Sequence, residues 1–255
     1  MKKLLLICLI LCGVISFGQN KKTDIILEEG KLLYRLEKGS WYGTDDMLSR
    51  FSSKRDSIGG YVSYEGSDKK VYTVFFNKFN PDEILIRYQF DHTPNTKPIN
   101  IDTTNRISTE LEKDLIAISM DARKRVFENV DEFFTFYENT SFNFIPIINK
   151  NKKKVFLLTG PQESGVVIIG NDYVLNYNKT NMFKNIKKIH NSILQFPYKS
   201  EDKENPIEST FHSHVVEDYI SSTDICTLLL YRDFVEWNQH IVIGDKEVSI
   251  FNLDK

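Results

Sequence analysis

Short apolar runs separated by turn residues mark the first third of the chain. β-branched and aromatic residues fill the segments 60–64, 71–76 and 84–90, and Gly-Ser-Asp or Asn-Pro-Asp stretches separate them. This pattern predicts strands joined by turns, because such side chains pack well on a pleated surface. The polar, proline-bearing segment 92–106 is predicted to be a loop.

A helical pattern follows this loop. Thr109 and Glu112 have the capping-box spacing, in which two side chains satisfy the first free amides of a helix. Apolar residues then keep one face to about Val126, so we expect a helix from Thr109 to Val126. A second short helix is expected at 130–137.

Strands return from Phe142 onward. We expect strands at 142–148, 154–158, 166–169, 173–177 and 209–214, a short edge strand at 186–190, a helix at 222–236 and a closing hairpin at 240–251. The expected fold class is α+β. A strand-rich N-terminal region with helices spans 19–139, and a C-terminal mixed α/β region spans 140–255. No flexible linker separates the two regions, so a single core shared by both is an alternative to two separate cores.

The first eighteen residues have the pattern of an export signal. Lys2 and Lys3 precede a short apolar stretch from Leu4 to Cys12, and Ser16-Phe-Gly18 supplies small residues at a cleavage position. The apolar stretch is too short to span a bilayer. We therefore expect cleavage after Gly18, a periplasmic or extracellular location, and no integral membrane segment after processing.

Processing would leave one cysteine and a nearly balanced charge. Cys226 would have no internal disulfide partner, so stability must come from a hydrophobic core. Removal of Lys2 and Lys3 changes the formal net charge from −2 to −4. This near balance argues against a nucleic-acid partner or an anionic membrane surface.

The segment from His212 to Asp224 carries the clearest chemical signal. Two histidines at positions i and i+2 of a strand project from the same face, so His212 and His214 can reach one ion while Ser213 points away. The start of the following helix can bring Asp224 back as a third ligand. Ser221 would then lie where it can donate a hydrogen bond to an oxyanion.

A structural interpretation of the same residues stays open. The spacing of Ser221 and Asp224 also fits a capping box, with a carboxylate at the positive end of a helix. In a chain with five histidines, an H-x-H pair alone is a weak motif. His190 and His240 lie at expected strand ends, where packing is the default, although His240 is the first candidate for a replacement ligand. Cys226, one turn inside the helix, is expected to be a buried small residue.

The order His212-Ser-His214, then Ser221-Ser-Thr-Asp224, resembles the H-x-H…S-x-x-D signature of JAMM/MPN-type zinc metallopeptidases, over roughly residues 140–255. The resemblance implies zinc held by His212, His214 and Asp224, with Ser221 binding the oxyanion. It also implies an upstream glutamate that activates the zinc-bound water, and a peptide or isopeptide bond as substrate.

The signature departs from the family in three places. Six residues separate His214 from Ser221 where the family usually has seven, and Val215 replaces the usual proline. Glu163 begins a segment similar to the family's E-x-x-G-x-x-x-G pattern, but its first glycine comes one place early. Glu138 is the alternative to Glu163 as the catalytic base.

Two functional hypotheses follow. In the first, the chain is an exported zinc-dependent hydrolase of an amide bond, with Glu163 as base and Ser221 as oxyanion donor. In the second, it is a non-catalytic exported binding or envelope-associated protein with a degenerate JAMM-like domain and a structural ion. In that case the N-terminal strands would carry the partner surface.

Overall fold

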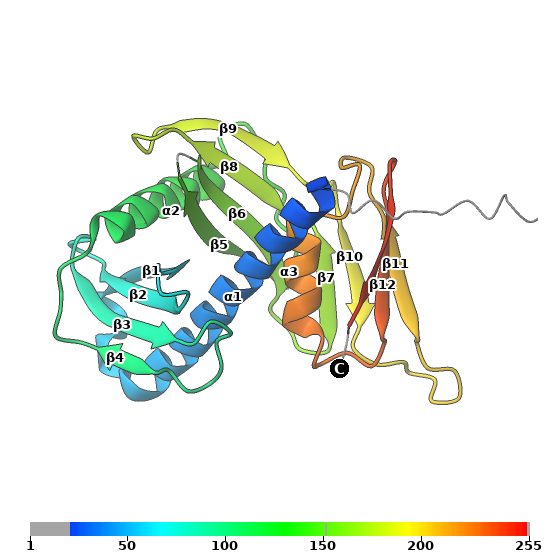
Figure 1. The fold of residues 1–255 in the computed structure, drawn as a ribbon, viewed down its shortest axis with the longest axis horizontal. Helices are drawn as coiled ribbons and strands as arrows, with labels where there is room; N and C mark the ends of the chain where they lie inside the picture. The colour runs from blue at the N-terminus through cyan, green and yellow to red at the C-terminus, as the bar shows by residue number, and fades with distance from the viewer. Residues whose placement is uncertain (1–20, 151, 254–255) are drawn as a thin grey trace, which may run out of the picture.

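A computed structural model describes residues 21–150 and 152–253 (Figure 1). The predicted export signal, with Cys8 and Cys12, lies outside these described residues. In chain order the described elements are α1 (Lys21–Arg50), the short 3-10 helix η1 (Ser52–Ser57), β1 (Ile58–Glu65), β2 (Val71–Asn77), β3 (Ile84–Phe90), β4 (Asn100–Asp102), α2 (Glu110–Glu128), β5 (Thr140–Asn149), β6 (Lys152–Pro161), β7 (Val166–Gly170), β8 (Tyr173–Tyr177), β9 (Phe183–Lys188), β10 (Ile193–Pro197), β11 (Ser209–Ser213), α3 (Ser222–Tyr231), β12 (Gln239–Ile243) and β13 (Val248–Asn252). The mixed α+β class is confirmed.

The N-terminal strands form an antiparallel sheet in the order β1-β2-β3-β4. The three strands expected from the sequence are present as β1, β2 and β3. The short strand β4 lies inside the segment predicted to be a loop, where Ile101 pairs with Tyr88 of β3. Both faces of this sheet carry buried side chains. Val74 and Phe75 of β2 and Ile86 of β3, for example, are at most 1% exposed.

Helix α1 was not predicted from the sequence. Three glycines within it, Gly30, Gly39 and Gly43, weaken its helical pattern. The structure shows what these glycines do. A Cβ atom on Gly30 would lie 2.6 Å from Cβ of Ile225 and 2.9 Å from the carbonyl oxygen of Ser222. Glycine is needed here because α1 and α3 cross at close range.

Helix α2 begins as predicted, with both bonds of the capping box present. The Thr109 hydroxyl accepts from the Glu112 amide at 3.2 Å, and the Thr109 amide donates to the Glu112 carboxylate at 2.8 Å. The helix expected at 130–137 is wrong. Asn129 adopts a left-handed conformation with φ of 40°, and its side chain bonds both the amide and the carbonyl of Phe134. These bonds close a turn instead of a helix.

The C-terminal strands form three small sheets. Their orders are β5-β6-β8-β9, β7-β10 and β11-β12-β13. The predicted strands are present, and β10 is an additional one. Helix α3 is shorter than predicted: it ends at Tyr231, and a turn follows in which the Phe234 amide donates to the Tyr231 carbonyl.

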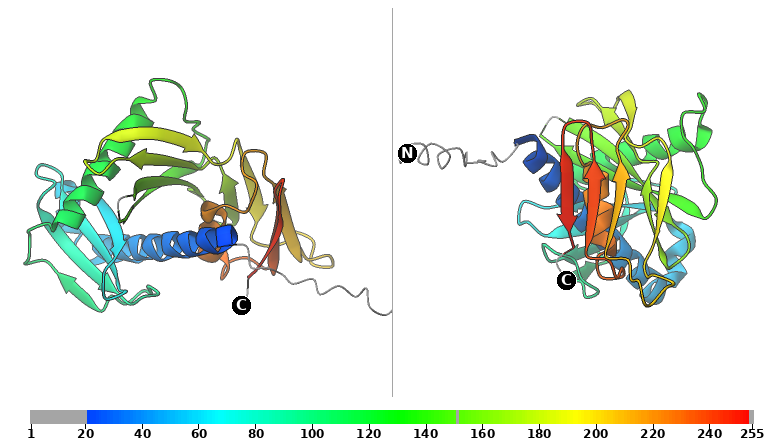
Figure 2. Two further views of the ribbon diagram at one scale, coloured as in Figure 1. Left: turned by 45° about the horizontal axis from the view of Figure 1, so that its top comes forward. Right: turned by 90° about the vertical axis from the view of Figure 1, so that its right-hand side faces the viewer.

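One core joins the two halves of the molecule. Helix α1 runs from the side of β11–β13 to the β1–β4 sheet, as Figure 1 and Figure 2 show. A continuous buried cluster contains Leu33 and Leu36 of α1, Phe75 of β2, Phe156 of β6 and Cys226 of α3. The division at residue 139 stays a prediction, but the core is shared across it. Among residues 21–150 and 152–253, no helix is long and apolar enough to cross a membrane.

Candidate metal centre

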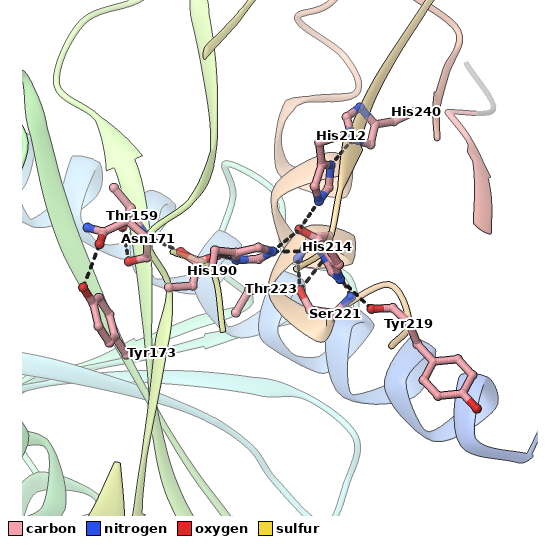
Figure 3. Close-up of polar contacts among 12 residues, drawn as sticks. Thr159, Asn171, Tyr173, His190, His212, His214, Tyr219, Ser221, Thr223 and His240 are labelled. Carbon is pink, nitrogen blue, oxygen red and sulfur yellow. Dashed lines mark hydrogen bonds and ion pairs between the residues drawn. The ribbon is translucent and has the colours of Figure 1, made fainter. Parts of the chain in front are cut away.

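Four side chains from three segments converge on one buried point (Figure 3). His212 lies in β11 and His214 directly follows this strand, Asp224 comes from the first turn of α3, and His190 lies after β9. One nitrogen or oxygen of each lies within 4.8 Å of all the others, and the four residues are between 0% and 8% exposed. The structure therefore brings together the three predicted ligands and adds a fourth donor.

Strand β11 presents its two histidines as the alternation of side chains requires. Its residues are alternately exposed and buried, with His212 inside and Ser213 outside. The amide of His214 donates to the carbonyl of Ile243 at 2.8 Å, which continues the parallel pairing with β12 past the strand end. Both imidazoles are therefore held from the backbone on the same side of the sheet.

His190 was expected to be a packed residue; it is buried, and the structure also places it in the converging group. Strands β8 and β9 form a hairpin, and the Ile189 amide donates to the Asp172 carbonyl at 2.8 Å just beyond the paired strands. This pairing places His190 beside Asp172. Gly170, with φ of 108°, leaves room for the loop that follows His190, since a Cβ atom on Gly170 would lie 2.2 Å from the Ser192 carbonyl oxygen.

Each converging histidine uses its outer ring nitrogen, Nδ1, for a second contact. Nδ1 of His190 lies 3.2 Å from the Asp172 carboxylate, and Nδ1 of His214 lies 2.7 Å from the Tyr219 carbonyl. Nδ1 of His212 lies 2.7 Å from Nε2 of His240, so His240 stands behind the donor group and is not a replacement ligand. Metal-bound histidines characteristically have such partners, which fix the ring and leave Nε2 for the ion.

The inner atoms of the group fit a cation. Nε2 of His190 and Nε2 of His214 are 3.0 Å apart, and Nε2 of His214 lies 3.0 Å from the Asp224 carboxylate. Asp224 Oδ1 lies 3.2 Å from Nε2 of His190 and 3.6 Å from Nε2 of His212. Four donors around a zinc ion with bonds of about 2 Å would be about 3.3 Å apart.

Two of these atoms also lack another partner. Nε2 of His212 and Oδ1 of Asp224 are buried and make no hydrogen bond within the described part of the chain. Buried polar atoms without partners are costly, and a shared ion would satisfy both. The donor set can therefore hold a metal ion, and imidazole with carboxylate suits zinc better than calcium or magnesium.

The charges at the centre also favour a cation. Burial opposes ionisation of Asp224, yet the histidines, His190 first among them, hold the pKa of this carboxyl well below its usual value. Burial likewise opposes a charge on His190, but Asp224 and Asp172 outweigh it and raise its pKa to about 10. For His212, burial prevails and lowers the pKa to about 4. The acidic groups thus favour one positive charge at this point, which a metal ion can supply.

The capping box of Ser221 and Asp224 is confirmed, and it leaves the Asp224 carboxylate beside the histidines. Ser221 caps α3, because its hydroxyl accepts from the Asp224 amide at 3.0 Å and its own amide donates to Asp224 Oδ2 at 2.8 Å. The second carboxylate oxygen, Oδ1, remains directed at the histidines. The Ser221 hydroxyl lies beside the centre, where it also contacts Asp224 Oδ2 and the hydroxyl of Thr223.

The structure does not bring a glutamate to the donor group. Glu163 is exposed on the loop before β7, whereas the opposite end of β7, at Gly170, is the one beside His190. About 13 Å of strand separates the two ends of β7. Glu138 is also exposed and lies beside the same distant loop, since the Gln162 amide donates to the Asn139 carbonyl. Neither residue belongs to the converging group.

Cys226 is buried one turn inside α3, with a free thiol. Burial raises the pKa of this thiol well above its usual value, which suits a packed apolar residue and not a nucleophile.

Comparison with protein-family models, with curated proteins and with solved structures found no match to this chain. The resemblance to JAMM/MPN-type metallopeptidases therefore rests on the spacing of His212, His214, Ser221 and Asp224.

Proposed function

We propose that the protein binds one divalent cation, preferably zinc, through His190, His212, His214 and Asp224. The observation that carries this proposal is the direction of the rings. Three Nε2 atoms and one carboxylate oxygen point at a common centre, while every Nδ1 lies within 3.2 Å of a second polar group. A set of three imidazoles and a carboxylate with these outer partners is typical of zinc.

The number of donors favours a structural ion. Four protein ligands fill a tetrahedral shell, whereas a catalytic zinc site keeps one position for water. Here His190 takes the fourth position. The ion would tie the loop after β9, strand β11 and the start of α3 to one another. This agrees with a non-catalytic exported binding or envelope-associated protein. Export is itself proposed, because the predicted signal, residues 1–18, lies outside the described residues.

A hydrolase of peptide or isopeptide bonds is the second candidate, and one cavity favours it. A space of about 210 Å³ is lined by His190, His212 and His214, with Leu194 and Val216 among its apolar walls. In this candidate His212, His214 and Asp224 alone hold the ion. His190, oriented by Asp172, would handle the proton that the family resemblance assigns to a glutamate. Bound zinc would supply a Lewis acid beside this cavity.

Metal analysis of the predicted mature chain, residues 19–255, tests the proposal. We expect one equivalent of zinc by mass spectrometry, and its loss in His212→Ala and Asp224→Ala. His92→Ala is the matched control, because this histidine is half-exposed on the loop after β3 and should leave zinc content unchanged. A wild-type chain that folds but takes up no zinc would refute the proposal.

His190→Ala separates the two candidates. If His190 is a structural ligand, its removal should weaken zinc affinity by more than about 100-fold, beyond the effect typical of outer partners. If it handles protons, the variant should keep most of its zinc affinity through the other three ligands. Competition with a chromophoric chelator measures the difference, and circular dichroism confirms that the variant is folded.

A further inference from the structure

Behind the donor group, a chain of hydrogen bonds runs from His212 through His240 to Thr210. Nδ1 of His212 lies 2.7 Å from Nε2 of His240, and Nδ1 of His240 lies 2.6 Å from the Thr210 hydroxyl. The register of the parallel strands explains the arrangement. Thr210 of β11 is directly opposite His240 of β12, and His212 is two residues further along the same face.

The ring of His240 has no access to water. It is 0% exposed, and aromatic side chains enclose it, with the Phe196 ring centroid at 5.3 Å and the Trp237 ring centroid at 5.9 Å. Both of its nitrogens must therefore find partners inside the protein. Thr210 and His212 are those partners, as Figure 3 shows for the pair of His212 and His240.

The protons along this chain can be arranged in two ways. In the outward arrangement, His212 donates from Nδ1 to His240, and His240 donates to the Thr210 oxygen. Nε2 of His212 then carries a lone pair, as a metal ligand requires. In the inward arrangement, Thr210 donates to His240 and His240 donates to His212. Nε2 of His212 then carries the hydrogen, and the lone pair needed for a metal is gone.

We propose that His240 is a positioning residue that holds His212 in the metal-binding tautomer, with Thr210 as the terminal acceptor. This inference rests on the proposed metal centre and extends it two residues beyond the ligands. Of the three histidines in the donor group, His212 alone depends on a side chain with interchangeable donor and acceptor roles. The Tyr219 carbonyl beside His214 only accepts, and so does an ionised carboxylate such as that of Asp172, which lies 3.2 Å from Nδ1 of His190. The tautomer of His240 therefore decides whether Nε2 of His212 has the lone pair that binds the ion.

Paired substitutions at His240 test this role. In His240→Phe the ring volume is kept but no acceptor remains, and we expect zinc affinity to fall by about 10- to 100-fold. In His240→Gln the amide oxygen can accept from Nδ1 of His212, so the affinity should stay within about threefold of wild type. Equal losses in both variants would mean that only the packing of the ring matters, and would overturn the proposal.

Thr210 provides a second pair that perturbs the fold less. Thr210→Val leaves the Nδ1 hydrogen of His240 without an acceptor in the outward arrangement and the Nδ1 lone pair without a donor in the inward one. A buried N–H without a partner costs more than a buried acceptor without one, so zinc affinity should fall. Thr210→Ser keeps the hydroxyl, so its zinc affinity should equal that of the wild type. Thr73→Val is the matched control, because Thr73 is buried like Thr210 and bonds the Ser63 hydroxyl, but lies in the N-terminal sheet. It should lower stability without changing zinc affinity.

Nitrogen NMR of labelled histidines gives a readout that packing alone would not move. In the zinc-loaded wild type, Nδ1 of His212 should show the shift of a protonated nitrogen, coupled to Nε2 of His240. If Nδ1 of His212 is unprotonated, or if His240→Phe and Thr210→Val bind zinc as tightly as wild type, the proposal is wrong. A wild type without zinc binding would instead refute the metal centre itself.

Discussion

The β1–β4 sheet and the β11–β13 sheet are built in opposite ways. In the first, both faces carry buried apolar side chains: Ile86 packs in the cluster that includes α1, and Val74 packs on the other face with residues of α2. In the second, the inward face carries histidines, while Phe211 and Ile250 on the outward face are 64% and 60% exposed. Figure 1 shows this second sheet at one end of the molecule, and the right-hand view of Figure 2 shows it facing the viewer. Burial stabilises the first sheet, and we infer that a metal ion stabilises the second.

The N-terminal sheet should respond to loss of apolar volume and not to metal. Phe75 is 1% exposed, and its ring packs between those of Tyr61 and Tyr88. We expect Phe75→Ala to lower the free energy of unfolding by about 3–5 kcal/mol. Urea titration measures the loss. Zinc affinity should not change, and a parallel drop in affinity would contradict the distinction between the two sheets.

The C-terminal sheet should respond to metal and not to apolar volume alone. Removal of zinc from a chain that had been saturated at 1,000 times its dissociation constant should cost about 4 kcal/mol of stability. Hydrogen exchange should locate the loss. Amides of β11, β12 and the first turn of α3 should exchange faster, while those of β2 and β3 keep their protection. Uniform loss across both sheets would show that the ion does not act locally.

Glu37 lies in α1, which links the two sheets, and makes stability depend on pH. Burial raises its pKa to about 7, and the hydrogen bond from Trp41 only partly offsets this. The folded chain therefore holds this proton more tightly than the unfolded chain. The resulting stability is complete below about pH 4.5 and is lost as the pH rises through about 7.

Glu37→Gln isolates this effect, because the amide stays neutral and can still accept from Trp41. Relative to the variant, the wild type should lose about 3 kcal/mol between pH 4.5 and pH 8. Thermal unfolding of both proteins at several pH values measures the difference. Parallel pH profiles would show that Glu37 is not protonated in the fold.

The crossing of α1 and α3 should show the smallest effect. Gly30→Ala would place a methyl group against Ile225 and the Ser222 carbonyl, which forces the helices apart and should cost about 1–3 kcal/mol. Because α3 also carries Asp224, zinc affinity should fall as well. Gly43→Ala in the same helix is the control, since its nearest contact would be Thr73 at 3.2 Å. Equal effects of both substitutions would contradict the special role of the crossing.

Features that depend on local spacing could be predicted from the sequence. The capping boxes at Thr109 and Ser221 need only residues three apart, and the common face of His212 and His214 needs only the alternation of a strand. The apolar runs of the N-terminal sheet were recognised for the same reason. In each case the physical cause lies within a few neighbouring residues.

Features that depend on distant contacts could not be predicted. Helix α1 was missed because Gly30 is unfavourable locally and explained only by Ile225, almost two hundred residues later. His190 joins the donor group through the register of the β8–β9 hairpin and the space that Gly170 leaves. Glu163 was chosen from its spacing to glycines, which does not say which end of β7 faces the histidines.

X-ray absorption at the zinc edge of the loaded chain tests the central claim most directly. We expect one zinc ion with four nitrogen or oxygen neighbours at about 2.0 Å and with the scattering pattern of three imidazoles. In His190→Ala the pattern should change to two imidazoles. A sulfur neighbour, fewer than three imidazoles in the wild type, or a spectrum unaffected by the loss of His190 would contradict the four-donor centre.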